Sequence, residues 1–269
     1  FTRFNEDTRM KATLITGASC GIGEEFARQL AAQGHNLVLV ARSEKKLHQL
    51  CDELMLAHKI TAHYIPADLS SAESIQKILD ETDRHGFEID WLINNAGFGS
   101  MGDFTELDLG RETEMIRLNI EALVALTHTY LLGMRSRQKG VVINVASTAS
   151  FQPVPFMATY AATKAFVTSF SEALAEENRP FGIVISALCP GPTATNFFAA
   201  ANAFPFAEKG VQTSEQVVAA ALRGVQSGKS KKISGFTNAL GAFLGQHLPN
   251  RIVAGAIARY LRSKIKERN

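Results

Sequence analysis

A tyrosine and a lysine one helical turn apart are the residues of this sequence best suited to chemistry. Tyr160 and Lys164 stand in the segment YAATK, at the start of a run with apolar residues at helical spacing. Side chains at positions i and i+4 share one helix face, so the phenol and the ammonium can address one small volume. Nearby positive charge favours a phenolate, which would let Tyr160 act as a general acid or base. The alternative is an exposed helical pair without a chemical role.

A glycine-rich segment follows the first apolar segment. The sequence TGASCGIG spans residues 16–23 and leads into an amphipathic stretch. Glycines allow a tight turn that brings backbone N–H groups and a helix N-terminus against a pyrophosphate. The strand, turn and helix context predicts a dinucleotide site here, although three glycines could also form a turn that binds nothing.

Short apolar segments rich in β-branched residues alternate with longer amphipathic segments, and these elements must position the chemistry. We expect strands at 12–16, 36–41, 61–67, 90–96, 140–146 and 183–189, and helices at about 23–33, 43–57, 70–85, 106–137 and 156–179. Strands that are apolar on both faces and separated by helices indicate a parallel sheet covered on both sides. The predicted fold class is a doubly wound α/β domain, in which ligands bind outside the carboxyl ends of the strands.

Composition and charge favour one globular domain. The chain has 269 residues, of which 46% are hydrophobic and 20% charged, enough for a sizeable core. A net charge of +2 gives no reason to expect nucleic acid. Cys20, Cys51 and Cys189 are scattered without metal-ligand spacing, so we predict no metal site and a reducing, cytoplasmic compartment. No spanning segment or signal core is visible, and residues 1–9 read as an extension, native or added for expression.

Five features together resemble the short-chain dehydrogenase/reductase family. They are the glycine pattern at 16–23, NNAG at 94–97, Ser147, the Tyr160 and Lys164 pair, and PG at 190–191, in the family's order between about Lys11 and Thr195. The resemblance implies one Rossmann-type domain over 10–269 with about seven strands. It also implies a nicotinamide dinucleotide cofactor and interconversion of carbonyl and alcohol groups.

The resemblance implies a catalytic set of Asn119, Ser147, Tyr160 and Lys164. Tyr160 would be the general acid/base, and Ser147 would hold the substrate oxygen. Lys164 would bind the cofactor ribose and, with an oxidised nicotinamide ring, lower the pKa of Tyr160 by roughly three units, or about 4 kcal/mol. Asn119 would hold a water that links Lys164 to solvent. The alternatives are a capping serine and an asparagine satisfied within its helix.

The remaining implied site residues contact the cofactor from loops after the strands. Asp68 would contact the adenine and Thr193 the nicotinamide carboxamide, although both could instead stabilise local turns. Asn94 would brace the central strands. The full predicted cofactor set is Gly17, Ser19, Cys20, Gly21, Ile22, Gly23, Arg42, Ser43, Asp68, Leu69, Asn95, Ala96, Gly97, Tyr160, Lys164, Pro190, Gly191 and Thr193.

Arg42 predicts which dinucleotide is used. The second predicted strand ends with Arg42 and Ser43, where an acidic side chain would bind the ribose 2′-hydroxyl of NAD. A guanidinium matches a phosphate in charge and geometry, so we predict NADP(H). A solvated arginine is the alternative, and position 20, where some NADP-preferring relatives carry a basic residue, holds Cys20.

The segment 190–212 is predicted to be the substrate loop. Its phenylalanines at 197, 198, 204 and 206 could form a lid over an apolar substrate or ordinary packing. With Phe98, Phe151 and Met157 they would favour a small hydrophobic ketone or aldehyde.

Residues 233–269 form a predicted C-terminal extension that ends in a basic amphipathic helix. Its expected apolar face consists of Ile252, Val253, Ala256, Ile257, Tyr260, Leu261 and Ile265. We expect this helix to pack on its own domain or a partner subunit, and peripheral contact with a membrane is the less favoured alternative. The resemblance further implies a homodimer or homotetramer paired through the helices at 106–137 and 156–179.

The favoured function is an NADP(H)-dependent oxidoreductase acting on a small hydrophobic carbonyl or alcohol. The main alternative is a dinucleotide-binding regulatory protein without turnover, which would not need a full catalytic set. Sugar-nucleotide epimerisation or dehydration ranks third, because those chains are usually longer and space their glycines differently.

Overall fold

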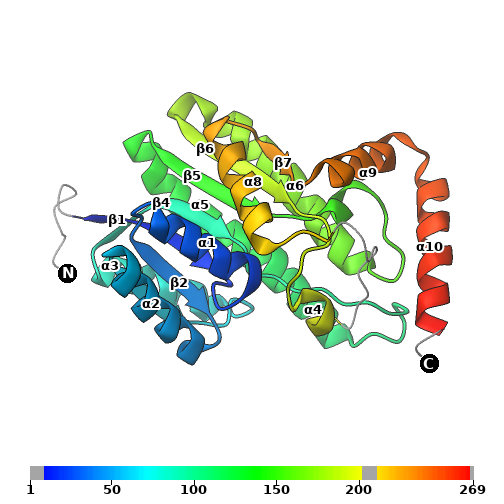
Figure 1. Ribbon diagram of the computed structural model, residues 1–269, viewed down its shortest axis with the longest axis horizontal. Helices are drawn as coiled ribbons and strands as arrows, with labels where there is room; N and C mark the ends of the chain where they lie inside the picture. The colour runs from blue at the N-terminus through cyan, green and yellow to red at the C-terminus, as the bar shows by residue number, and fades with distance from the viewer. Residues whose placement is uncertain (1–8, 202–210, 267–269) are drawn as a thin grey trace.

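A seven-stranded parallel sheet forms the centre of the computed structural model, which describes residues 9–201 and 211–266 (Figure 1). The strand order is β3-β2-β1-β4-β5-β6-β7. All six predicted strands are present, and β7 adds the seventh at one edge. The bounds are β1 Met10–Thr16, β2 Leu37–Ala41, β3 Ala62–Pro66, β4 Phe87–Asn94, β5 Gly140–Val145, β6 Ile183–Cys189 and β7 Lys231–Ile233.

Helices cover both faces of the sheet, as the doubly wound fold predicts. Figure 1 shows α1, α2 and α8 in front of the sheet, with α5 and α6 behind it. Each layer encloses its own apolar core, one around Phe26 and Val218 and the other around Ile78 and Leu126. The helix bounds are α1 Gly21–Ala32, α2 Glu44–His58, α3 Ala72–Arg84, α4 Leu109–Ile116, α5 Ala122–Arg137, α6 Ala158–Asn178, α7 Phe197–Ala200, α8 Ser214–Gln226, α9 Phe236–His247 and α10 Asn250–Lys266.

The predicted helix at 106–137 differs from the structure in two respects. It begins after Asp108, whose carboxylate caps α4 by accepting the N–H of Arg111 at 2.7 Å. Between α4 and α5 the chain forms a π-helical turn over Arg117–Glu121, and this turn contains Asn119. Single π-helical turns inside α-helices are frequent at functional sites.

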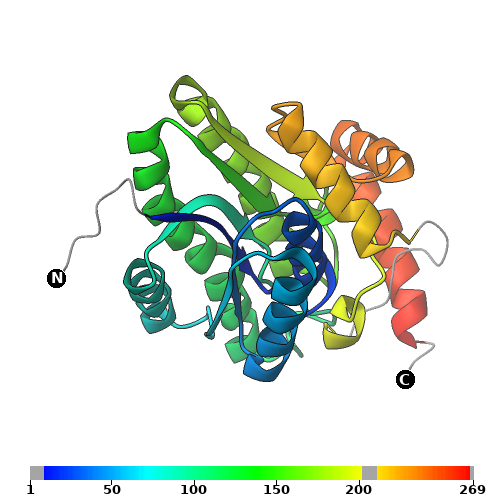
Figure 2. The same cartoon turned by 60° about the vertical axis from the view of Figure 1, so that its left-hand side comes forward.

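The C-terminal helices lie at the end of the molecule away from the start of β1 (Figures 1 and 2). Helix α10 packs on its own domain, as the favoured expectation holds, but only part of the predicted apolar face points inward. Val253, Ile257 and Ile265 are half-buried, whereas Ala256 is exposed. Ile252 is 61% exposed and Tyr260 is also exposed, whereas Leu261 is completely buried in a cluster with Met157 and Tyr160. The apolar stripe of α10 is wide enough for the helix to pack on the domain in two rotations about its axis. The contacts of Leu261 in the buried cluster select one of them.

Among the described residues, no helix has both the length and the hydropathy needed to cross a membrane.

Candidate active site

A cavity of about 720 Å³ lies at the carboxyl ends of the central strands. It opens beside β1, where the strand order changes direction. Strands β2 and β3 lie on one side of β1, and strands β4 to β7 lie on the other. Such switch points leave a crevice between loops that diverge to opposite faces of the sheet. The sequence predicted this location from the alternation of strands and helices.

The predicted cofactor residues come together around this cavity. All of them line it except Gly23, which is buried below the turn. Gly17 and Gly21 have φ angles of +65° and +60°, which favour glycine. A Cβ on Gly23 would lie 2.3 Å from the Gly17 carbonyl oxygen, so only glycine allows α1 to approach the turn so closely. This open backbone cradle, at a helix N-terminus, fits the pyrophosphate of a dinucleotide.

Asn95 and Thr16 lock the glycine turn to the end of β4. The Asn95 side-chain amide donates to the carbonyls of Thr16 at 2.9 Å and Gly17 at 3.2 Å. The Thr16 hydroxyl accepts the N–H groups of Asn95 at 2.9 Å and Ala96 at 3.0 Å. Asn95 therefore shapes the cradle as well as lining it.

Asn94 braces the centre of the sheet, as the family resemblance implied. Its side-chain amide donates to Asn144 on β5 at 2.8 Å and to Thr127 on α5 at 2.9 Å. These buried bonds fix the strand end from which Asn95 projects.

Tyr160, Lys164 and Ser147 meet inside the cavity. Tyr160 and Lys164 are only 8% and 6% exposed, so the alternative of an exposed helical pair is wrong. The Lys164 ammonium donates to the Val145 carbonyl at 2.7 Å and lies 5.9 Å from the centre of the Tyr160 ring. The Ser147 hydroxyl is hydrogen-bonded to Tyr160 and also accepts the N–H of Ala149 at 3.1 Å. Ser147 thus both caps the next turn and faces the phenol.

Burial sets the protonation states of this group. Desolvation raises the pKa of Tyr160 to about 12, and the hydrogen bond from Ser147 acts in the opposite direction. Desolvation also lowers the pKa of Lys164 to about 8. The expectation that Lys164 and an oxidised nicotinamide ring together lower the pKa of Tyr160 concerns the protein with its cofactor bound and stays a prediction. Tyr160 holds its proton at neutral pH and is poised as an acid.

Asn119 is buried and positions the loop after β4. Its side-chain amide donates to the Phe98 carbonyl at 3.0 Å and to the Thr163 hydroxyl at 3.1 Å. Its carbonyl accepts the Phe98 N–H at 3.2 Å. These contacts join the loop to α6 next to Lys164, and the implied water contact stays a prediction.

Arg42 is exposed at the rim of the cavity, near Asp68. Asp68 accepts hydrogen bonds from the Ser70 N–H at 3.0 Å and the Ser70 hydroxyl at 2.7 Å. These bonds and the charge of Arg42 lower the pKa of Asp68. Asp68 thus stabilises its own turn while facing the cavity. The Thr193 hydroxyl likewise donates to the Gly191 carbonyl at 2.9 Å. Asp68 and Thr193 therefore stabilise their own turns, as the alternative held, and both also line the cavity.

Aromatic side chains form one wall of the cavity. Phe98, Met157, Phe197 and Phe198 line it, and the Phe197 ring centre lies 5.2 Å from that of Tyr160. Phe204 and Phe206, which were also predicted to cover the substrate, lie outside the described residues.

Phe151 does not line the cavity, so its predicted role is wrong. It packs instead in a buried cluster with Leu123, Val167 and Ala242. The short 3₁₀ turn Thr148–Phe151 carries it past the cavity wall to this layer.

Sequence reasoning missed the contribution of the C-terminal helices. Thr237, Asn238, Gly241 and Ala242 of α9 and Ile257 of α10 line the cavity. A Cβ on Gly191 would lie 2.4 Å from the Asn238 side chain, so that glycine makes room for α9. The unusual run of small residues in NALGA was the sequence signal that could have indicated this close packing.

Cys20 is exposed and lines the cavity at the N-cap position of α1.

Comparisons with known proteins agree with this geometry. The model of the short chain dehydrogenase family matches residues 11–205. Hydroxysteroid dehydrogenase-like protein 1 of Gallus gallus is 32% identical over 246 residues, covering 90% of this chain and 73% of that protein. The very-long-chain 3-oxoacyl-CoA reductase of Homo sapiens is 35% identical over 187 residues, covering 68% of this chain and only 59% of that protein.

A solved structure extends the likeness over nearly the whole chain. The short-chain dehydrogenase from Sphingobium yanoikuyae, in complex with NADPH, is 30% identical with a TM-score of 0.77, and the match covers 95% of this chain and 96% of that one.

Proposed function

This chain belongs to the short chain dehydrogenase family, oxidoreductases of alcohol and carbonyl groups, and we propose that it reduces bulky hydrophobic ketones with NADPH. The observation that carries the proposal is the buried Tyr160 hydroxyl, which is hydrogen-bonded to Ser147 beside an aromatic wall. A protein that only sensed dinucleotides would not need a proton donor placed against a substrate cavity.

Arg42 supports NADP(H) over NAD(H). It follows β2 directly and is succeeded by Ser43, so no carboxylate stands there to bind a 2′-hydroxyl or repel a 2′-phosphate. Its guanidinium is exposed at the cavity rim and can pair with a phosphate. The relative from Sphingobium yanoikuyae, 30% identical, was solved with NADPH.

The side chains of the cavity divide the work of carbonyl reduction. Bound NADPH supplies the hydride that the carbonyl carbon accepts. The Tyr160 hydroxyl donates its proton to the carbonyl oxygen, which becomes the alcohol oxygen, and the Ser147 hydroxyl holds that oxygen by a hydrogen bond. Lys164, fixed by the Val145 carbonyl, presents its ammonium beside the resulting phenolate. That positive charge favours the phenolate until solvent returns the proton.

The substrate class follows from the cavity wall. Phe98, Met157, Phe197 and Ile257 offer apolar surface, and each buried methylene adds about 0.8 kcal/mol to binding. Similar proteins bear the names hydroxysteroid dehydrogenase-like protein and very-long-chain 3-oxoacyl-CoA reductase. We therefore infer a ketone carried on a long acyl chain or a fused-ring skeleton.

Reduction assays with matched ketones test this function. The purified protein is given NADPH or NADH with a long-chain 3-oxoacyl thioester, a fused-ring ketone or acetone, and loss of the reduced-cofactor absorbance is followed. We expect NADPH-dependent turnover with a bulky ketone, at a kcat/KM at least tenfold above acetone, as about two further buried methylenes would give. NADPH binding without turnover of either bulky ketone would favour the regulatory alternative.

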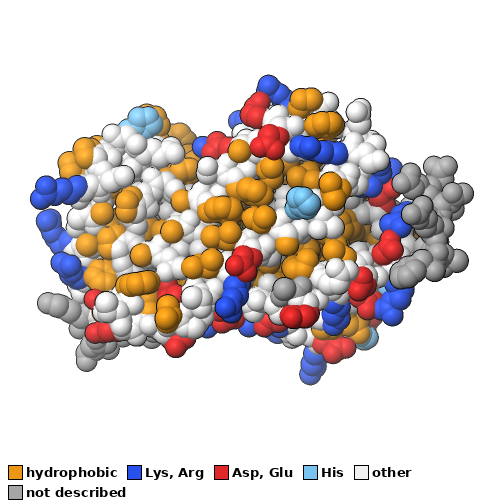
Figure 3. All heavy atoms as spheres, turned by 180° about the vertical axis from the view of Figure 1, so that it is seen from behind, with side chains coloured by type: hydrophobic (Ala, Val, Ile, Leu, Met, Phe, Trp, Pro, Cys, Tyr) orange, Lys and Arg blue, Asp and Glu red, His pale blue; other side chains and the backbone are white. Residues whose placement is uncertain are grey.

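We further propose that the protein forms a homodimer through the face built by α4, α5 and α6. Figure 3 shows hydrophobic side chains spread across the back of the molecule, with only scattered charges. Leu109, Leu132 and Phe166 are exposed on these helices. Contiguous exposed apolar surface marks interaction sites. Leu132→Glu should give a monomer in sedimentation velocity, whereas Leu56→Glu, at an exposed leucine of α2 on the opposite face, should not; a dimeric L132E protein would contradict this interface.

A further inference from the structure

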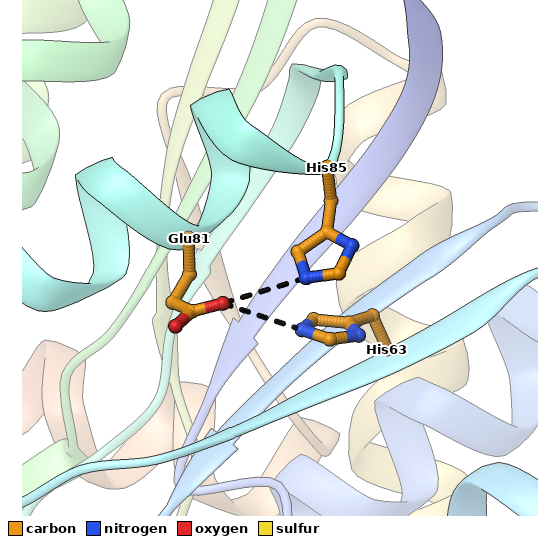
Figure 4. A group of neighbouring side chains, drawn as sticks. All are labelled: His63, Glu81 and His85. Atoms are coloured by element: carbon orange, nitrogen blue, oxygen red, sulfur yellow. Dashed lines mark ion pairs between the residues drawn. The ribbon is translucent and has the colours of Figure 1, made fainter.

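Three potential metal ligands from two elements converge at the end of the molecule away from the cavity. His63 lies on β3, while Glu81 and His85 lie one turn apart at the end of α3 (Figure 4). Figure 4 shows both imidazole rings turned towards the same carboxylate oxygen. One potential ligand atom from each residue lies within 4.8 Å of the other two.

The distances approach those of a tetrahedral metal site. The Glu81 Oε2 atom lies 3.4 Å from His85 Nε2 and 3.9 Å from His63 Nε2. Metal–ligand bonds of 2.0–2.2 Å at tetrahedral angles separate neighbouring ligand atoms by about 3.3 Å. The two distances from the Glu81 carboxylate therefore exceed this separation by less than one ångström.

The surroundings hold the ligands in place. The Arg84 guanidinium pairs with the other carboxylate oxygen of Glu81, leaving Oε2 directed at the histidines. The His85 N–H donates to the Glu81 carbonyl at 3.1 Å, and Gly86 ends the helix with a φ of +67°. The Phe87 ring backs both imidazoles, with ring centres 6.1 and 6.3 Å away. A ligating carboxylate whose second oxygen is held by another side chain, as Arg84 holds Glu81, is common at metal sites.

The charge of the cluster suits a divalent cation. The imidazole ring centres are 4.1 Å apart, so two imidazolium ions would repel each other strongly. The side chains of His63, Glu81 and His85 are 28%, 22% and 42% exposed, which leaves one side open to a water as fourth ligand.

We propose that His63, Glu81 and His85 form a site for Zn²⁺ or a similar borderline divalent cation, which clips the edge strand β3 to helix α3. Two nitrogen ligands and one oxygen ligand are a set that zinc takes in proteins, whereas Mg²⁺ prefers oxygen ligands alone. Because β3 pairs only with β2 in the described sheet, this link would secure an otherwise one-sided strand.

Calorimetric titration of the EDTA-treated, dialysed full chain with ZnCl₂ tests the proposal. We expect one equivalent to bind with micromolar affinity or better, and MgCl₂ to give no binding. A hundredfold excess of Zn²⁺ over Kd should raise the Tm by about 5–10 °C. Absence of Zn²⁺ binding at tens of micromolar would overturn the proposal.

Matched variants locate the bound ion. His63→Ala and His85→Ala should each weaken Zn²⁺ binding by at least about 100-fold, the upper end of what loss of an outer-shell partner causes. His48→Ala is the control, because His48 forms a similar i,i+4 pair with Asp52 at 3.1 Å but belongs to no described group of three ligands. Unchanged affinity in H85A, or a loss in H48A as large as in H85A, would contradict the assignment.

Folding of the variants is checked separately. The Tm in EDTA should differ little between H85A and the parent, since the His85 side chain is 42% exposed and lies at the surface. Glu81→Gln keeps the side-chain volume and provides a second test if H63A fails to fold, and it should also weaken Zn²⁺ binding.

Discussion

The cavity around Tyr160 and the cluster of His63, Glu81 and His85 lie at opposite ends of the sheet and differ in how they control protons. In the cavity, burial is the largest influence, and it moves the pKa of Tyr160 to about 12 and that of Lys164 to about 8. In the cluster the side chains are partly exposed, and neighbouring charges matter as well: His85 adds to desolvation in lowering the pKa of His63, whereas Arg84 outweighs desolvation and lowers the pKa of Glu81.

The difference indicates two uses of titratable side chains. A buried phenol keeps its proton until a specific partner takes it, which suits a donor in catalysis. Partly exposed imidazoles next to a carboxylate can exchange a proton for a cation, which suits reversible binding. The comparison therefore predicts that variants at one end change turnover, and variants at the other change stability and metal affinity.

The largest expected effect is that of Tyr160→Phe on turnover. Removing the hydroxyl removes the proton donor, and general acid catalysis contributes about 10²- to 10⁴-fold, so kcat should fall within that range. Tyr130→Phe is the matched control, because burial also raises the pKa of Tyr130 to about 12 but its hydroxyl contacts Thr82 between α3 and α5. Equal losses in both variants would mean that burial of a phenol, rather than its place in the cavity, explains the effect.

Arg42→Asp should change cofactor preference by about 10- to 100-fold. Loss of a charge-assisted hydrogen bond removes roughly 1.5–3 kcal/mol, and the new carboxylate repels a 2′-phosphate. The ratio of kcat/KM for NADPH to that for NADH measures this change. Lys45→Asp makes the same change of charge on an exposed residue in the first turn of α2, which does not line the cavity, and it should leave the ratio nearly unaltered. A similar shift in both variants would indicate a general effect of charge.

Local sequence patterns predicted the elements that act through local chemistry. The strand and helix periods lie within each segment, and Tyr160 and Lys164 share a face because both belong to α6. The glycine turn was predicted because its backbone requirements are local. These features do not depend on which distant segment packs against them.

Features that depend on distant contacts were missed or wrong. The wall formed by α9, including Asn238 beside Gly191, joins residues far apart in the chain. The cluster joins His63 with Glu81 and His85 across the loop between β3 and α3. The desolvation that raises the pKa of Tyr160 in the protein alone was also missed, because a sequence shows neighbouring charges but not burial.

Leu261→Ala should lower the free energy of unfolding by about 2 kcal/mol, a typical minimum for a fully buried leucine. Because Leu261 packs in the same cluster as Tyr160 and Met157, the variant should also raise KM for bulky ketones more than for acetone. Chemical denaturation and kinetics measure the two effects. Ile252→Ala, at an exposed position of the same helix, should change stability by less than about 0.5 kcal/mol.

The smallest expected effect concerns stability against pH in the absence of metal. The pKa of His63 is lowered on folding, so the unfolded chain binds more protons just below pH 6.5, and stability should rise with pH through that window. His63→Asn should flatten this rise, because it removes a group that binds protons more readily in the unfolded chain. The pKa of His35 is also lowered, so some slope should remain.

Zinc should steepen the same slope, because the imidazoles must lose their protons before they can bind the ion. Urea unfolding at pH 5.5 and 7.5, with EDTA or with ZnCl₂, measures both contributions in the parent and in H63N. A steeper slope with Zn²⁺ in the parent but not in H63N would tie proton release and metal binding to the same ring. Tyr160, with a pKa of about 12, titrates far above this window. Lys164, with a pKa of about 8, adds to the rise only near pH 7.5, and its contribution should be the same with EDTA and with ZnCl₂.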